Sequence, residues 1–258
     1  MLSSLRLIAR TIVTGKPMPY SGLDLINRVL VASGRAPVSA PTWEGWIKDL
    51  KDDAEMADAY EHARPTLAKH RAPSTYPLSW SDRVDRTSHL VDVFYGLMRA
   101  LKPNSVIETG VAYGMTSSLM LAAFQHNQSG KLLSIDLPNR GQLRMEGADT
   151  GILVANAHRK RWELVLTDSV YELPARMKDT AIDVFVHDSA HTYANMAYEY
   201  CLAAMHLPTN GVIISDDILW NSAFTDIMRG LKYKTFSHSK SHNLGISVVA
   251  RSTPKTTS

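Results

Sequence analysis

Cysteine is nearly absent from this sequence: among its 258 residues, Cys201 is the only one. One thiol cannot form a disulfide within the chain, which excludes the small disulfide-stabilised folds and favours a reducing compartment. We therefore expect a cytoplasmic protein. Cys201 stands in an apolar helical pattern without a basic neighbour, so we expect a buried structural thiol rather than a nucleophile.

Long apolar runs and long runs of one charge are also absent. No apolar stretch approaches the ~20 residues that span a bilayer, so we expect no transmembrane segment. The formal net charge is only +3, and Lys and Arg form no long cluster, which argues against nucleic acid as a partner. The stretch MLSSLRLIARTIVTG has no acid and fits an amphipathic basic helix packed on this chain or on a second subunit. A transit peptide or an interfacial helix is the alternative.

The chain divides into two parts by pattern. Residues 1–75 carry helical periodicity interrupted by prolines, and we predict a helical N-terminal extension that serves as a lid or as the interface of a homo-oligomer. Residues 76–258 are predicted to form one α/β domain, because 45% hydrophobic and 21% charged residues are typical of a globular chain with a substantial core.

Short β-branched runs alternate with helical segments from residue 105 onward. This alternation predicts a doubly wound, Rossmann-like sheet of seven strands, mostly parallel, with helices on both faces. Residues 233–252 are predicted to form two strands joined by a polar turn, so the last strand is expected to be antiparallel. Residues 79–102 are predicted to form one amphipathic helix that ends before Pro103.

Ligands of such sheets bind beyond the carboxyl ends of the strands, so the residues that follow each predicted strand are the candidates for a binding site. The first strand ends in ETGVAYGMTS, which contains Glu108, Gly110, Gly114 and Thr116. The two glycines permit a tight turn close to a ligand, and the following helix favours an anionic or polar group at its start. An ordinary strand-to-helix turn is the alternative.

Acids follow the next two strands as well. Asp136 ends one strand, and Asp168 with Ser169 ends another. A carboxylate at the first position can accept hydrogen bonds from ribose hydroxyls, and the second pair could meet an adenine amine. Each of these residues could instead cap a helix. Acids at three successive strand ends favour a nucleoside site over three unrelated caps.

Three further acids follow the last two parallel strands: Asp188, and the adjacent pair Asp216 and Asp217. Carboxylates this close repel one another unless a cation lies between them, a proton is shared or water screens them. His187 and His191 stand beside the first acid. The alternative for the pair is a solvated, metal-free turn.

At this point the sequence resembles a known family. ETGVAYGMTS resembles the first motif of the class I S-adenosylmethionine-dependent methyltransferases, and its spacing does not fit the dinucleotide fingerprint. FVHDSAHTY and SDDILWNSAF are similar to segments of metal-dependent bacterial sugar and macrolide O-methyltransferases. The resemblance covers roughly residues 76–250 and retains the order of the motifs.

The resemblance implies a role for each matched residue. Glu108, Gly110 and Gly114 would lie along the methionine end of S-adenosylmethionine, with Asp136 at its ribose and Asp168 near its adenine. Mg²⁺ would be held by three carboxylates, which are those of Asp188, Asp216 and Asp217. The implied activity is O-methyl transfer to a hydroxyl of a sugar, a saccharide or a related natural product.

The general base is where the sequence departs from the family pattern. Ala190 stands where relatives can show a second Asp. His191 is the best substitute, because a neutral imidazole suits general-base work near neutral pH; an orienting role is the alternative. Trp220 and Asn221 could line the acceptor pocket, although a core position for the tryptophan fits equally. Two other functions stay open: a metal-independent methyltransferase that uses His191, and a non-catalytic nucleoside-binding subunit.

Overall fold

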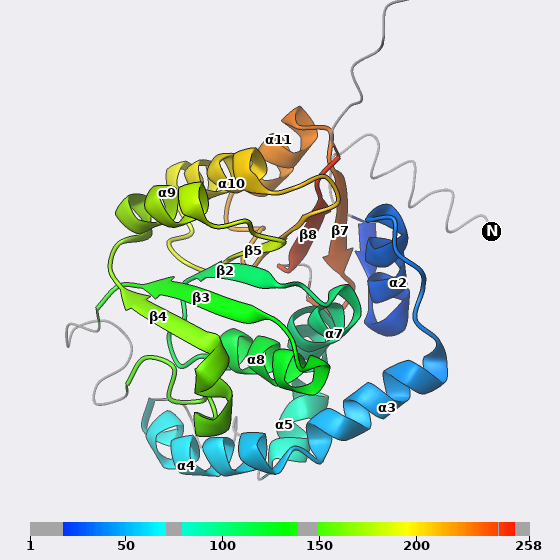
Figure 1. The fold of residues 1–258 in the computed structure, drawn as a ribbon, viewed down its shortest axis with the longest axis vertical. Helices are drawn as coiled ribbons and strands as arrows, with labels where there is room; N and C mark the ends of the chain where they lie inside the picture. The colour runs from blue at the N-terminus through cyan, green and yellow to red at the C-terminus, as the bar shows by residue number, and fades with distance from the viewer. Residues whose placement is uncertain (1–17, 71–78, 139–148, 242, 251–258) are drawn as a thin grey trace, which may run out of the picture.

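The computed structural model describes residues 18–70, 79–138, 149–241 and 243–250, which form one eight-stranded sheet with helices on both faces (Figure 1). The basic segment at the start of the sequence lies outside these residues. The strands are β1 (Met18–Tyr20), β2 (Ser105–Thr109), β3 (Lys131–Asp136), β4 (Trp162–Leu166), β5 (Val184–His187), β6 (Val212–Ser215), β7 (Lys234–His238) and β8 (Gly245–Val248).

The strand order is β1-β7-β8-β6-β5-β2-β3-β4. Strand β8 runs antiparallel to both of its neighbours, and every other pair is parallel. The predicted seven strands and the antiparallel last strand are therefore confirmed. The structure adds β1, which pairs with β7 at the edge and was not predicted.

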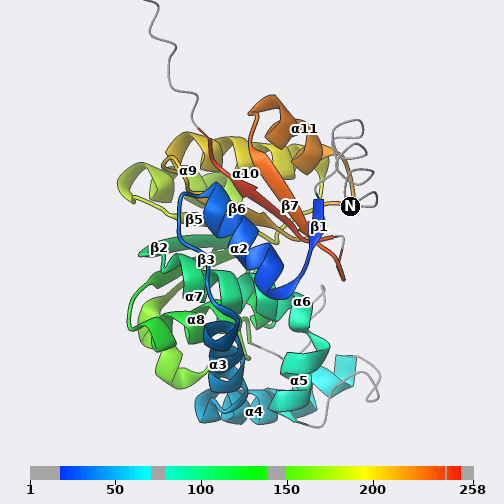
Figure 2. The same cartoon turned by 90° about the vertical axis from the view of Figure 1, so that its right-hand side faces the viewer.

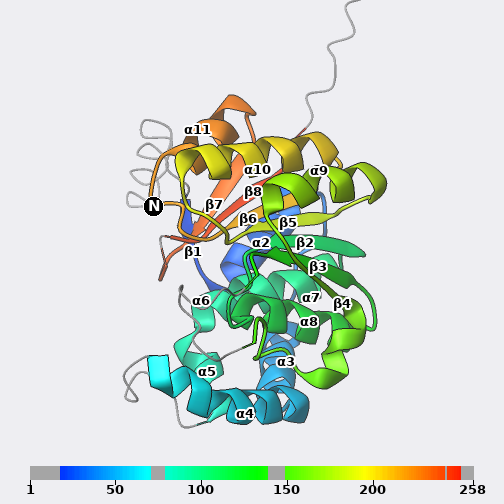
Figure 3. The same ribbon diagram turned by 90° about the vertical axis from the view of Figure 1, so that its left-hand side faces the viewer.

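Helices cover the sheet in two layers, and a third group lies outside them. The helices are α2 (Gly22–Ala32), α3 (Ala40–Lys51), α4 (Ala54–His70), α5 (Trp80–Arg86), α6 (Ser88–Leu90), α7 (Leu97–Leu101), α8 (Met115–Asn127), α9 (Ser169–Asp179), α10 (Tyr193–His206) and α11 (Ala223–Gly230), with a π-helix η2 (Val91–Gly96) and a 3-10 helix η3 (Asn156–Arg161). Helices α9, α10 and α11 cover one face, and α2, α7 and α8 cover the other (Figure 3). Helices α3, α4 and α5 lie farther from the sheet, beyond α7 and α8 (Figure 2).

The parallel strands are buried on both faces, so successive side chains enter different cores. Val106 packs in the core beneath α8, whereas its neighbour Ile107 packs in the core beneath α10. Phe185 faces the α10 side between Val184 and Val186, which face the α8 side. The near-continuous apolar runs of the sequence follow from this double burial.

The N-terminal helices share the core of the α8 side. Leu25 of α2 and Tyr60 of α4 belong to the same buried cluster as Val106. The Trp80 indole is buried and donates to the Leu50 carbonyl at 2.8 Å, which ties α5 to α3. The predicted boundary at residue 75 lies outside the described residues, so the division into an extension and a domain stays a prediction.

The single helix predicted for residues 79–102 is wrong, because the segment breaks into four pieces. Thr87 leaves the helical conformation with φ −107° and ψ 28°, and its hydroxyl donates to the Arg83 carbonyl. The π-helix η2 then carries Asp92, whose Oδ2 accepts from the Gly22 amide at 2.7 Å and lies 2.8 Å from His238 Nε2. A π-turn places one extra residue in the helix, and here it coincides with the polar link between α2 and β7.

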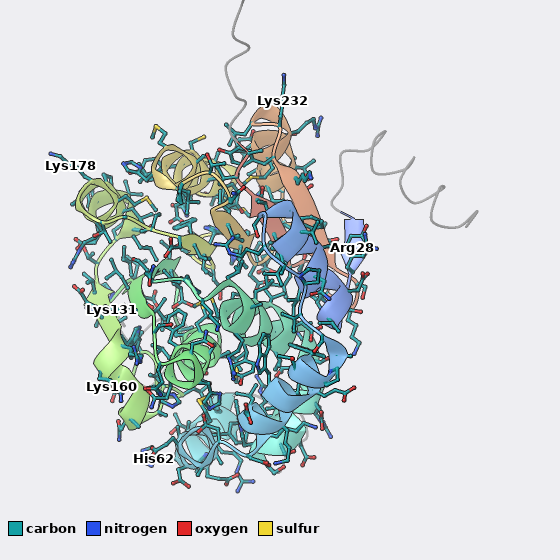
Figure 4. All side chains as sticks on the ribbon, turned by 45° about the vertical axis from the view of Figure 1, so that its right-hand side comes forward. Arg28, His62, Lys131, Lys160, Lys178 and Lys232 are labelled. Atoms are coloured by element: carbon teal, nitrogen blue, oxygen red, sulfur yellow. The ribbon has the colours of Figure 1, made fainter. Side chains whose placement is uncertain are left out.

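The prediction that Cys201 is buried is also wrong, because its side chain is exposed on α10. Met196, Tyr200 and Ala203 of that helix face the core, which turns Cys201 toward solvent. Within the described ranges, none of the helices is both long enough and apolar enough to cross a bilayer. Arg28, Lys131 and Lys178, labelled in Figure 4, project from three different elements at separate parts of the surface.

Candidate active site

The loop between β2 and α8 is a tight turn that requires glycine at two positions. Gly110 has φ +83° and Gly114 has φ +80°, a region that side-chain-bearing residues rarely adopt. A side chain at position 110 would collide with the backbone carbonyl of Asp188, and one at position 114 would place Cβ 2.8 Å from the Gly151 Cα. The carboxyl ends of β2 and β5 therefore approach each other closely at this loop.

Glu108 lies at the end of β2 with no exposed surface. Its carboxylate accepts hydrogen bonds from the hydroxyls of Thr116 at 2.7 Å, Ser117 at 2.6 Å and Ser134 at 2.7 Å. Burial raises the pKa of Glu108 to about 7, against the lowering effect of these three hydroxyls. The bonds join β2, β3 and the start of α8, so Glu108 and Thr116 position the glycine loop.

Asp136 and Asp168 both bond to backbone amides at the same sheet edge. Asp136 Oδ2 accepts from the amides of Val111 at 3.0 Å and Ala112 at 2.8 Å, which holds the glycine loop against the end of β3. Asp168 accepts from the Val170 amide at 2.9 Å and is the N-cap of α9. The capping role considered for Asp168 is thus present; the ribose and adenine roles stay predictions.

The three acids beyond β5 and β6 are brought together. Burial raises the pKa of Asp188 well above its ordinary value, and the carboxylates of Asp216 and Asp217 add to the effect. Burial also raises the pKa of Asp216. Asp217 has φ +53°, a conformation that asparagine and aspartate adopt more readily than other residues, and its Oδ1 accepts from Asn243 at 3.0 Å. Burial and mutual repulsion thus favour the neutral forms of Asp188 and Asp216 in this cluster.

His191 lies between two of these acids. Its Nε2 is 3.8 Å from Asp188 Oδ1 and 3.6 Å from Asp217 Oδ2. Asn221 holds this loop by donating to the His191 carbonyl at 3.0 Å. The imidazole is therefore placed to exchange a proton with the acid cluster.

The carboxylates of this acid cluster suit a hard divalent cation, because carboxylate oxygens are the ligands that Mg²⁺ prefers. The three acids do not form a complete metal site as they stand. In the described part of the chain, no three His, Cys, Asp or Glu side chains are grouped so that they could hold a metal ion. The chemistry of the predicted ligands Asp188, Asp216 and Asp217 fits Mg²⁺, whereas their arrangement leaves the coordination incomplete.

Sequence reasoning missed Glu199, a carboxylate of α10 without exposed surface. It accepts hydrogen bonds from Thr109, Ser169 and Ser189, and it bonds His187 Nδ1 at 2.6 Å. A signal was available: Glu199 falls on the same stripe of α10 as the buried Met196 and Ala203, where an acid is unusual.

Aromatic side chains are exposed next to the acid cluster. Trp220 is 64% exposed, which excludes the core position that the sequence left open. Its ring centroid lies 5.4 Å from that of His191. Tyr193 at the start of α10 is 47% exposed. The Trp220 ring therefore provides flat apolar surface beside His191.

Comparison with known proteins shows which fold the chain shares. Residues 107–218 match the model of a family described as a methyltransferase domain. No curated protein matches the chain. Solved structures share the fold at low identity. The O-methyltransferase TomG from Streptomyces achromogenes, involved in tomaymycin synthesis and solved with S-adenosylmethionine, has a TM-score of 0.52 and 15% identity, covering 78% of this chain and 92% of TomG.

Two other structures show the same relation. An O-methyltransferase from Bacillus cereus, solved with S-adenosylhomocysteine, has a TM-score of 0.51 and 13% identity, covering 81% of this chain and 99% of its own. A methyltransferase from Geobacter sulfurreducens has a TM-score of 0.51 and 18% identity, covering 83% of this chain and 98% of its own.

Proposed function

We propose that this chain, whose residues 107–218 match the model of a methyltransferase-domain family, transfers the methyl group of S-adenosylmethionine to a hydroxyl oxygen. One observation carries the proposal: the glycine loop after β2 touches the backbone of Asp188 after β5, because a side chain at Gly110 would meet the Asp188 carbonyl. A donor bound along the loop would therefore present its methyl group to the acid cluster.

The chemistry requires position and one proton acceptor. The acceptor oxygen attacks the methyl carbon, the carbon–sulfur bond breaks, and the donor leaves as neutral S-adenosylhomocysteine. The hydroxyl proton passes to a base, and His191 Nε2 is the candidate because it lies within 3.8 Å of both Asp188 and Asp217. Alignment of the two reactants supplies much of the rate acceleration in such a transfer.

We further propose that Mg²⁺ assists the transfer. Asp188, Asp216 and Asp217 would hold the ion, which would lower the pKa of the acceptor hydroxyl when bound. Burial first, and then the neighbouring carboxylates, raise the pKa values of Asp188 and Asp216, so a bound cation would favour the ionised forms that could act as its ligands.

The acceptor is proposed to be a sugar, a saccharide or a related natural product. The resemblance of FVHDSAHTY to segments of sugar and macrolide O-methyltransferases supports this class. The exposed rings of Trp220 and Tyr193 also support it, because an aromatic face can pack on the apolar face of a ring-shaped acceptor. A cytoplasmic location and a homo-oligomer formed through the N-terminal helices stay predictions.

The proposal is tested by titrating S-adenosylhomocysteine into the protein with and without Mg²⁺, together with a direct Mn²⁺ titration. We expect nucleoside binding and a separate divalent site that Asp188→Asn removes while the nucleoside affinity stays within about threefold. Asp183→Asn is the matched control, because Asp183 precedes the same strand at its other end and accepts from the Asn104 amide. A chain that does not bind the nucleoside would overturn the proposal.

A metal-independent methyltransferase is the second candidate, and the position of His191 between Asp188 and Asp217 favours it. It predicts full turnover in EDTA, whereas the metal-assisted reaction predicts none. Under both mechanisms His191→Gln should lower turnover by about 100-fold, within the range of general-base contributions. An unchanged rate in the variant would remove His191 as the base. Nucleoside binding without turnover on any hydroxylated acceptor would point instead to a binding subunit.

A further inference from the structure

We infer that Glu199 is the positioning residue that holds the donor-binding loops and the acid cluster in one geometry. The inference rests on the proposed function, because it assigns the two ends of the site to a methyl donor and its acceptor. Glu199 itself belongs to α10, and its side chain has no exposed surface.

Each oxygen of the Glu199 carboxylate is bonded to two different parts of the site. Oε2 accepts from the Thr109 hydroxyl at 2.7 Å and lies 2.6 Å from His187 Nδ1. Oε1 accepts from the Ser169 hydroxyl at 2.7 Å and from the Ser189 hydroxyl at 3.0 Å. One side chain therefore connects the ends of β2 and β5 with the start of α9.

The bonded residues are the immediate neighbours of the predicted site residues. Thr109 precedes Gly110 of the donor loop, and Ser169 follows Asp168 on the proposed adenine side. His187 and Ser189 stand on either side of Asp188, so the backbone of this acid is held from both directions. Glu199 bonds the predicted residue Ser169 directly but reaches Asp188 only through its neighbours His187 and Ser189, so its role at the acid cluster is positioning rather than catalysis.

The bonds also favour the charged form of Glu199. Burial alone raises its pKa, but the hydrogen bonds from His187 and the hydroxyls outweigh burial and lower it below the ordinary value. An ionised carboxylate only accepts, so His187 Nδ1 carries the proton of that bond. A glutamine at position 199 would direct its NH2 group toward hydroxyl or imidazole groups that now donate to Glu199. At least one of these buried groups would then lose its hydrogen-bond acceptor.

The experiment compares S-adenosylhomocysteine affinity by calorimetry with Mn²⁺ affinity by electron paramagnetic resonance, so that no acceptor is needed. Glu199→Gln should weaken both by 10- to 100-fold, the range found when residues that orient ligands are changed. Thr109→Val should weaken only nucleoside binding, and Ser189→Ala only Mn²⁺ binding, each by about tenfold or less. In the Glu199→Gln background, Thr109→Val should have no further effect on the nucleoside.

Glu172→Gln is the matched control, since it removes a helical glutamate that pairs with Arg176 at the surface. It should change neither affinity. The inference is overturned if folded Glu199→Gln keeps both affinities within twofold of the wild type. If that variant does not fold, unchanged affinities in both Thr109→Val and Ser189→Ala overturn it.

Binding by the wild-type chain separates the test of the proposed function from the test of the role of Glu199. A wild-type chain that does not bind the nucleoside removes the methyltransferase proposal itself. A wild-type chain that binds the nucleoside but not Mn²⁺ removes only the metal, and the Thr109→Val and Glu199→Gln nucleoside affinities then decide the inference.

Discussion

The two faces of the sheet each bury one glutamate, and the two carboxylates differ in charge. Glu108, on the α8 side, is bonded by three hydroxyls, and burial raises its pKa to about 7. Glu199, on the α10 side, is bonded by hydroxyls and by His187, and its pKa is lowered. Both side chains have no exposed surface. For Glu199, the hydrogen bond and the charge interaction with His187 are the largest effects that lower the pKa, whereas Glu108 is bonded by hydroxyls and has no such partner.

The largest change in the free energy of unfolding is expected when the buried carboxylate of Glu199, on the α10 side, is replaced by a neutral amide. At pH 8, Glu199→Gln should lower the free energy of unfolding by about 3–5 kcal/mol, because it breaks a buried pair with His187. A carboxyl whose folded pKa is lowered stabilises above its unfolded pKa, near 4.5, and this contribution is lost as the pH falls through the folded pKa. Urea unfolding should therefore show the gap to wild type narrowing below pH 4.5. A gap that does not change with pH would contradict the charged state.

Glu108, on the α8 side, should change the stability with pH in the opposite direction to Glu199. Because the folded pKa of Glu108 is raised from 4.5 to about 7, the wild type loses stability as the pH rises through this window, on the order of 3 kcal/mol. Glu108→Gln has no such titration. Its unfolding free energy relative to wild type should therefore increase by this amount between pH 4.5 and pH 8. A parallel pH dependence in the two proteins would show that Glu108 is ionised throughout; Glu172→Gln serves as the surface control.

The smallest change in the free energy of unfolding is expected at Trp220, beside the acid cluster. Trp220→Ala removes a ring that is 64% exposed, so the free energy of unfolding should change by less than about 0.5 kcal/mol. If the ring packs on the acceptor, the acceptor KM should rise about fivefold while S-adenosylhomocysteine affinity stays unchanged. A change in nucleoside affinity instead would place Trp220 on the donor side of the site.

The sheet was predictable where local pattern and burial agree. The parallel strands are short β-branched runs separated by helices, and the strand-end acids follow them directly. Strand β1 was missed because three residues, with Pro19 in the middle, show no alternation. The break at Thr87 was missed because the apolar periodicity continues through it, while the contacts of Asp92 with Gly22 and His238 that accompany the π-turn are remote in sequence.

The site was predictable as a set of positions but not as a network. Glycines and acids at strand ends point to the loop and to the acid cluster from sequence alone. The bonds of Glu199 join residues up to 90 positions apart, such as Thr109, and no local pattern encodes them. The separation of the acids, which decides whether a metal fits, likewise depends on how the ends of β5 and β6 pack.

The pairing of β1 with β7 has a consequence for the order of synthesis. Met18 lies opposite Phe236, and Asp92 bonds both Gly22 and His238, so the first edge of the sheet waits for residues made more than 200 positions later. At translation rates of 5–20 residues per second, this delay is roughly 10–45 s. During that interval the leading strand β1 has no partner strand.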